Sequence, residues 1–204
     1  RVTRMDKKLK HPQVNGGAIS AWKTVSQVTY DALGQAKSKT LGGTLAINDY
    51  QYNIRGWLLN INKDFVSGTA ANKFFGMELG YDKPSANKNY GTGLLNGNIK
   101  GTVWKSKGDG VQRSYSFTYD AVNRLMTAGY AGVAGEDHSV TMGTNGTDPN
   151  TAYDYNGNIK AMTQKGWVNG GNTTLDNLVY TYKNTNASNR LESVSDAGTT
   201  ITAQ

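Results

Sequence analysis

The residue types that most often perform catalysis are scarce in this chain. It contains two histidines, His11 and His138, and no cysteine, which excludes disulfides, zinc–thiolate sites and cysteine nucleophiles. Glu136, Asp137 and His138 are consecutive, a grouping that could bind a metal or relay a proton. Because neighbouring side chains of an extended segment point in alternate directions, we interpret these three residues as part of a solvated loop.

A second acidic segment has the oxygen spacing of a calcium loop. Asp154-Tyr155-Asn156-Gly157-Asn158 resembles the start of such a loop, but it lacks the glycine at the sixth position and the distal glutamate. We therefore interpret it as a turn. The glycines do not follow the spacing of a dinucleotide-binding motif. These observations predict a chain that is not an enzyme, with no catalytic residue, no metal site and no cofactor.

The aromatic and basic residues leave two kinds of binding to consider. Trp22, Trp57, Trp104 and Trp167 could stack on sugar rings, although aromatic residues at repeated strand positions more often pack within a sheet. The net charge of +7 could attract nucleic acid or anionic membranes, but the charges are spread out, and the densest run lies at Arg1 to Lys10. We expect a solvated surface, no nucleic acid partner and, since no apolar run is long enough, no membrane span.

The composition predicts an all-β chain with frequent turns. Hydrophobic residues make up 37% of it, with 12 tyrosines, 25 glycines and only 3 prolines. Tyrosine rings with polar tips suit thin, half-exposed sheets, and glycine weakens long helices while permitting tight turns. We expect repeated antiparallel β-hairpins and almost no helix.

An internal repeat is the strongest signal in the sequence. Three motifs occur twice, in the same order and with short insertions between them. They are Gly97-Asn98-Ile99-Lys100 with Gly157-Asn158-Ile159-Lys160, Tyr115–Tyr119 with Leu178–Tyr182, and Asn123-Arg124-Leu125 with Asn189-Arg190-Leu191. Earlier, Val28–Gly34 resembles Phe117–Asn123, and Tyr52–Trp57 is a weaker relative of the Asn-Gly-Asn-Ile motif. Roughly three double units fill the chain.

Each unit predicts a hairpin with a tight turn. Tyr115, Phe117 and Tyr119 alternate with serine and threonine, as in a half-buried strand. The turn from Asp120 to Asn123 should use the aspartate as a hydrogen-bond acceptor and the asparagine in the left-handed conformation. Further tight turns are predicted at Asn15-Gly16, Asn96-Gly97, Asn145-Gly146, Asn156-Gly157 and Asn169-Gly170. Two stretches interrupt this rhythm without helical periodicity, Lys63–Asn89 and Gly129–Asn150, and we expect the second to be a long surface loop.

An ordered set of repeat residues identifies a family that the chain resembles. The residues are Tyr30, Asp31, Gly34, Tyr52, Asn53, Asn98, Ile99, Trp104, Tyr119, Asp120, Asn123, Arg124, Leu125, Asn158, Ile159, Tyr182, Arg190 and Leu191. They are similar to the tyrosine–aspartate repeats of the Rhs/YD-repeat family over about residues 18–195. The resemblance implies a spirally wound antiparallel sheet that forms part of a hollow shell, as in bacterial Rhs toxins, insecticidal toxin complexes and teneurins.

The resemblance also implies a function and partners. We expect a structural wall segment of a large, secreted or surface-exposed bacterial protein that encloses or presents a C-terminal, toxin-like cargo. Its partners would be neighbouring repeats and that cargo in the same polypeptide, with export machinery or surface glycans as further candidates. The expected organisation is a basic lead-in or linker at 1–17, repeats at 18–195, and the start of a next strand or a truncated end at 196–204. A cell-surface adhesin or carbohydrate-binding β-module is the alternative.

Three departures from the family pattern stand out. The second copy reads Tyr182-Lys183 in place of Tyr-Asp, and the earliest reads Gly34-Gln35 in place of Asn123-Arg124, so we expect looser repeat geometry at both positions. The family core ends in an Asp-Pro-x-Gly signature associated with self-cleavage. Asp148-Pro149-Asn150-Thr151 lacks its glycine, and no catalytic role is carried over to it.

Overall fold

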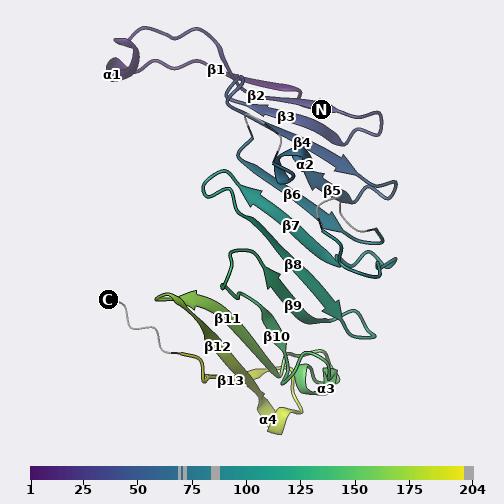
Figure 1. Ribbon diagram of the computed structural model, residues 1–204. Coiled ribbons are helices and arrows are strands. Elements are labelled where there is room, and N and C mark those ends of the chain that lie inside the picture. The colour runs from purple at the N-terminus through teal and green to yellow at the C-terminus, as the bar shows by residue number, and fades with distance from the viewer. Residues whose placement is uncertain (69, 71–72, 84–87, 200–204) are drawn as a thin grey trace. The chain divides into compact units, whose positions relative to one another are not determined.

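The computed structural model describes residues 1–68, 70, 73–83 and 88–199 (Figure 1). These residues belong to two compact units. The first unit contains Arg1–Leu79 and Val103–Gln112. The second contains Lys88–Thr102, the short segment 80–83 and the chain from Arg113 onward. In each unit the strands lie side by side in the order of the sequence, and every neighbouring pair described below is antiparallel.

The first unit is built on six successive strands. Each pairs with the next one along the chain, as hairpins joined by short connections do. They are β1 (Arg4–Lys7), β2 (Lys23–Tyr30), β3 (Ala36–Leu41), β4 (Ala46–Tyr52), β5 (Leu58–Ile61) and β6 (Phe75–Gly80). Along β2 the exposed and half-buried residues alternate strictly, which is the period of a strand with one covered face.

The second unit repeats this plan. The strand β7 (Gly101–Ser106) has residues in both units. The strands that follow it also pair in sequence order. They are β8 (Gln112–Tyr119), β9 (Leu125–Ala131), β10 (Val140–Met142), β11 (Ala161–Val168), β12 (Gly171–Tyr182) and β13 (Leu191–Asp196). A small core of Met126, Met142, Ala152 and Tyr153 holds β9, β10 and a short helix together.

Helix is confined to four short segments of the described chain. Each has four residues, and they are α1 (Pro12–Asn15), α2 (Lys63–Val66), α3 (Pro149–Ala152) and α4 (Lys183–Asn186). Asp148 caps α3 by accepting a hydrogen bond from the Asn150 amide at 3.0 Å. The predicted all-β fold of antiparallel hairpins with almost no helix is confirmed. No helix among the described residues has the length and apolarity to cross a membrane.

The structure corrects the expectation of a long surface loop at Gly129–Asn150. The strand β10 lies inside that stretch, between β9 and β11, with Val140 opposite both Ala128 and Gln164, and α3 begins near its end. Three residues are too few for alternation to be visible in a glycine-rich sequence, which is why the strand was missed. The other interruption, Lys63–Asn89, contains α2 and β6, and residues 69, 71–72 and 84–87 of it lie outside the described chain.

The predicted boundaries at residues 17 and 195 stay predictions. Within 1–17, the strand β1 pairs with β2, with Arg4 opposite Gln27 and Lys7 opposite Lys23. At the other end, β13 finishes at Asp196. Residues 200–204 of the expected terminal segment lie outside the described chain.

Candidate functional site

The most regular polar arrangement in the protein is the turn between β8 and β9. Asp120 Oδ1 accepts the amides of Val122 and Arg124 at 3.0 and 2.8 Å, and its Oδ2 accepts Arg124 Nε at 2.6 Å. The Asp120 amide donates to the Arg124 carbonyl at 2.9 Å, and Asn123 is left-handed with φ 69°. The carboxylate side chain is only 3% exposed, so its oxygens are committed to closing the turn.

Electrostatics keep this carboxylate ionised. Burial opposes its charge, but hydrogen bonds from the backbone and side chain of Arg124 and from the Val122 amide outweigh burial. The pKa of Asp120 is therefore below its ordinary value. The predicted roles of Asp120 as an acceptor and of Asn123 as the left-handed residue are confirmed.

The same turn occurs at three other places. In each, an aspartate or asparagine exchanges hydrogen bonds with the residue four positions later, and the residue three positions later is a glycine with φ of 80–86°. The turns are Asp31–Gln35, Asn53–Trp57 and Asp154–Asn158. The hairpins closed by the turns at Asp31, Asn53 and Asp120 also share a β-bulge at the tyrosine before the turn, as expected when the last turn residue is left-handed.

The tyrosine before three of these turns, and Tyr182 before α4, is anchored by its hydroxyl group. Each of these four hydroxyls donates to a backbone carbonyl that lies more than fifteen residues earlier in the chain. The pairs are Tyr30 with Val2 at 2.9 Å, Tyr119 with Ile99 at 2.7 Å, Tyr153 with Leu125 at 2.6 Å and Tyr182 with Ile159 at 2.9 Å. Burial raises the pKa of Tyr119, Tyr153 and Tyr182, so these phenols stay protonated donors.

Side chains also connect neighbouring turns to one another. The contacts run from the end of one turn to the next and involve amide or guanidinium groups. They are Gln35 Nε2 to the Gly56 carbonyl at 3.4 Å, Asn96 and Asn98 Nδ2 to Asn123 Oδ1 at 2.5 and 3.1 Å, Arg124 Nη1 to the Asp154 carbonyl at 3.3 Å, and Asn158 Nδ2 to Asn189 Oδ1 at 2.8 Å. The guanidinium of Arg124 also stacks over the Tyr153 ring at 4.5 Å.

Most of the remaining predicted repeat residues lie next to turns. Tyr52 precedes Asn53 and is opposite Leu58, Trp104 is in β7, and Leu125 and Leu191 begin β9 and β13. The Arg190 carbonyl accepts the Lys183 amide at 2.9 Å. Apart from Trp104, which lies inside β7, the structure thus places these predicted residues in or beside turns.

The expectation of looser geometry is right at one departure and wrong at the other. At Tyr182-Lys183 the turn expands, and Asn184, Thr185 and Asn186 all have positive φ, because no aspartate follows the tyrosine to close a compact turn. At Gly34-Gln35 the turn is unchanged, with the Gln35 amide 2.8 Å from Asp31 Oδ1. The backbone amide makes this bond, so the arginine side chain is dispensable for closure.

The sequence analysis did not identify Tyr153 and Asp154 as the start of a further repeat turn. Asp154 Oδ1 accepts the amides of Asn156 and Asn158 at 2.9 and 2.8 Å, and Oδ2 accepts Asn158 Nδ2 at 2.7 Å. The turn interpretation, rather than a calcium loop, is therefore confirmed. The signal that could have found it is the Tyr-Asp dipeptide with glycine three positions after the aspartate.

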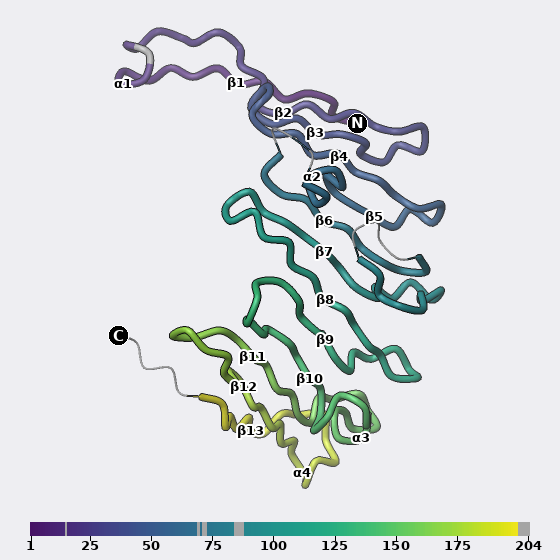
Figure 2. Tube along the Cα trace, in the orientation of Figure 1, coloured from purple at the N-terminus to yellow at the C-terminus, as the bar shows by residue number. Residues whose placement is uncertain are grey.

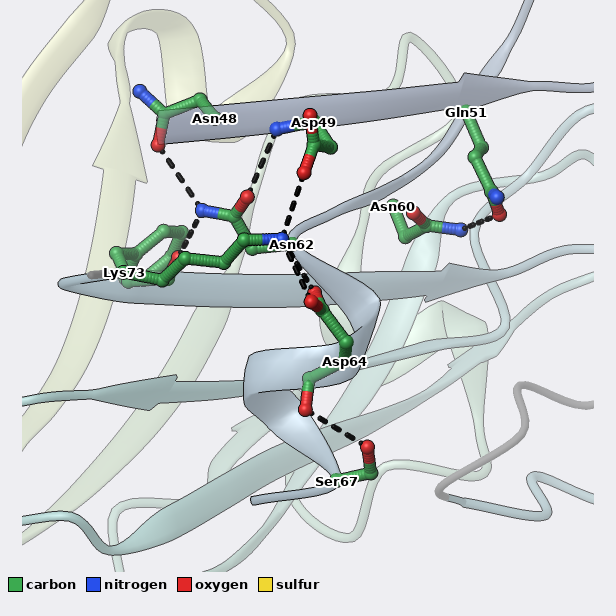
Figure 3. Close-up of polar contacts among 9 residues, drawn as sticks. Asn48, Asp49, Gln51, Asn60, Asn62, Asp64, Ser67 and Lys73 are labelled. Carbon is green, nitrogen blue, oxygen red and sulfur yellow. Dashed lines mark hydrogen bonds and ion pairs between the residues drawn. The ribbon is translucent and has the colours of Figure 1, made fainter. Parts of the chain in front are cut away.

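A second polar cluster lies in the first unit, around Lys73 (Figure 3). Lys73 Nζ is 2.7 Å from Asp49 Oδ2 on β4 and 2.7 and 2.8 Å from the two carboxylate oxygens of Asp64 on α2. Beside it, the fully buried Asn62 is left-handed with φ 48° and accepts the Asp49 amide at 2.8 Å. Its Nδ2 donates to the Phe75 carbonyl at 2.7 Å. The cluster joins β4, α2 and β6.

The Lys73 cluster is an ion-pair network with a protonated lysine. Burial alone would lower the pKa of Lys73, but hydrogen bonds to Asp49 and Asp64 outweigh it and raise that pKa. Burial likewise opposes the charge of Asp49, and the hydrogen bonds from Lys73 and Ser38 lower its pKa. An ammonium held in this way is a poor nucleophile or base. No sequence signal predicts this cluster, since Lys73 and Asp64 come from the segment where the repeat rhythm is interrupted and Asp49 comes from a separate strand, β4.

The acidic loop and the histidine take part in loop packing. His138 Nε2 is 3.4 Å from Glu136 Oε2, whereas Asp137 Oδ2 pairs with Lys165 at 3.0 Å and the Asp137 amide donates to Asn172 Oδ1 at 2.7 Å. Glu136 and His138 therefore lie next to each other, whereas Asp137 has other partners. Within the described residues, no group of three histidine, aspartate or glutamate side chains could hold a metal ion.

Comparison with known proteins gives a likeness in fold. No family model matches the sequence, and no curated protein matches it. A structure of the Photorhabdus luminescens Tc holotoxin pore with a mutation in TccC3 is similar over 90% of this chain and 9% of that chain, with 15% sequence identity and a TM-score of 0.53. This likeness shows a shared fold. The chain has the antiparallel β-architecture of a segment of that toxin and spans about a tenth of its length.

A second solved structure aligns less well. A complex of TcdB2, TccC3 and Cdc42 is matched over 97% of this chain and 11% of that chain, with 13% identity and a TM-score of 0.42. The shared fold therefore rests on the holotoxin structure.

Proposed function

We propose that this chain is a structural wall segment of a large bacterial Rhs-repeat protein that encloses or presents a C-terminal, toxin-like cargo. The observation that carries the proposal is the fourfold recurrence of one turn, with the same hydrogen bonds around Asp31, Asn53, Asp120 and Asp154. Recurrence of a unit that pairs only with its neighbours is the mark of a repeat architecture. The likeness in fold to a Tc toxin segment supports the toxin association.

The chemistry of the turns suits a wall better than a catalytic site. The aspartate oxygens accept hydrogen bonds from backbone amides, and the tyrosine hydroxyls donate to carbonyls of residues earlier in the chain. Groups used in this way hold strands in register. We therefore propose a non-catalytic role, with neighbouring repeats and the cargo of the same polypeptide as partners, in a secreted or surface-exposed protein.

The test uses the natural parent polypeptide. We would purify it under native conditions, determine its mass and sequence, and image it by electron microscopy. A long repeat array followed by a C-terminal region that resists protease until the shell is unfolded is the expected result. A parent that ends near Gln204, or one whose C-terminal region is digested at once, would overturn the container proposal.

Two variants of the parent polypeptide test whether the wall itself protects the C-terminal region from protease. Asp120→Ala opens one turn of the wall and should expose the C-terminal region to protease at a lower denaturant concentration. Tyr155→Phe is the matched control, because Tyr155 follows Asp154 in an equivalent turn but is fully exposed. Equal protease resistance of the two variants would mean that the turn does not contribute to the enclosure.

A further inference from the structure

The segment between β1 and β2 forms an arm that extends beyond the ends of the neighbouring strands, with α1 at its tip (Figures 1 and 2). Its two sides are joined by the Ser20 amide to the Leu9 carbonyl at 2.9 Å and by the Leu9 amide to Ser20 Oγ at 2.9 Å. A bridge between Lys10 and Ile19 continues the pairing. The arm is therefore an ordered two-stranded extension.

The arm is strongly basic. Residues 7–23 include Lys7, Lys8, Lys10 and Lys23 and contain no aspartate or glutamate. All four lysines are exposed. More than half of the net charge of +7 therefore lies on this one projection.

The same arm exposes large apolar side chains. Val14, Ile19 and Trp22 are 68%, 66% and 63% exposed, and Leu9 is also exposed. The Lys8 ammonium lies 4.8 Å from the centre of the Trp22 ring, which places a cation and an aromatic ring side by side. Apolar groups of this size usually face a partner when several gather on one projection.

The combination points to one class of partner. Phosphates of nucleic acid would attract the lysines but offer little to valine and isoleucine side chains. An anionic lipid surface offers both, because headgroups attract lysine and the boundary with the acyl chains accepts tryptophan and aliphatic groups. We propose that the arm from Lys7 to Lys23 binds anionic membrane surfaces, with Trp22 and Ile19 entering the interfacial layer.

The experiment is co-sedimentation of the full chain with vesicles. We expect binding to vesicles that contain phosphatidylglycerol and little binding to phosphatidylcholine alone. Each lysine near an anionic surface strengthens binding about fivefold, so the triple variant Lys7→Glu, Lys8→Glu, Lys10→Glu should reduce binding at least tenfold. Trp22→Ala should reduce it several-fold and abolish the vesicle-induced blue shift of tryptophan fluorescence.

The matched control changes the same amount of charge elsewhere. Lys37→Glu, Lys63→Glu and Lys83→Glu alter three exposed lysines outside the arm and should leave most of the binding intact. Thermal unfolding of each variant confirms that the sheet is folded. The proposal is overturned if the chain does not sediment with phosphatidylglycerol vesicles, if the control triple loses as much binding as the arm triple, or if Trp22→Ala has no effect.

Discussion

At the scale of single residues, Asp120 shows how one carboxylate closes a hairpin. Asp120→Ala removes the acceptor of two amides and of Arg124 Nε, and we expect a loss of about 2–3 kcal/mol in the free energy of unfolding. Asp120→Asn should cost roughly half as much, because Asn53 accepts the equivalent amides in its own turn. Urea denaturation measures both. If the two variants were equally unstable, the ion pair with Arg124 rather than the amide bonds would hold the turn.

The ion pairs of Lys73 should make the stability of the protein depend on pH. Its folded pKa is raised, so its contribution is complete below the unfolded value of about 10.4 and is lost as pH rises through the folded pKa. The pKa of Asp49 is lowered, so its contribution is complete above about pH 3.9 and is lost as pH falls through the folded value. The ion pairs should therefore stabilise the protein across the neutral range and weaken at both extremes.

Lys73→Met tests this dependence. Because both carboxylates are about half exposed, we expect a loss of only about 1–2 kcal/mol near neutral pH. The difference from the unmodified chain should shrink in strong acid and in strong alkali, as followed by urea denaturation at each pH. Lys63→Met, at an exposed position of α2, is the control and should change little. A difference that stays constant at all pH values would contradict the ion-pair interpretation.

At the scale of elements, the left-handed residue at the end of each turn decides whether a hairpin can close. Gly157 has φ +86° and open space around it, so Gly157→Ala adds only backbone strain. We expect a loss of about 1 kcal/mol. Gly157→Asn should be milder, since Asn123 occupies the same position of its turn.

The control for this element is Gly171→Ala. Gly171 has equally open surroundings but lies outside the left-handed region, so its replacement should be neutral or slightly stabilising. Thermal unfolding of the variants gives the comparison. Equal losses at Gly157 and Gly171 would mean that the backbone conformation is not what the glycine supplies.

The elements also show what the sequence could and could not predict. The hairpin at Asp120 was predictable because its alternation, its turn residues and its repeat all point to the same structure. The strand β10 was not, since three residues show no period, and its pairing with β9 and β11 depends on neighbours on both sides. The Lys73 cluster depends on contacts between β4 and residues of the stretch without repeats, which local patterns do not encode.

At the scale of the molecule, antiparallel ladders predict a gradient of protection. The strand β12 is bonded to both β11 and β13, whereas β13 pairs only with β12 among the described residues and is exposed along its whole length. We expect the amides of Leu191–Asp196 to exchange with deuterium at least about tenfold faster than those of β12. Hydrogen exchange followed by mass spectrometry measures this. Equal rates would indicate that another strand covers β13 in solution.

The tight turns also contain sites of slow chemical degradation. The turn between β11 and β12 is an exposed Asn169-Gly170 pair in which both residues have positive φ. Asparagine followed by glycine is the sequence most prone to spontaneous deamidation, because glycine leaves the asparagine side chain open to attack by the next amide nitrogen. The rearranged product carries an extra backbone methylene and a new negative charge. The residue pair that allows strands to reverse so sharply is therefore also a point at which a long-lived copy of this protein would lose a hairpin.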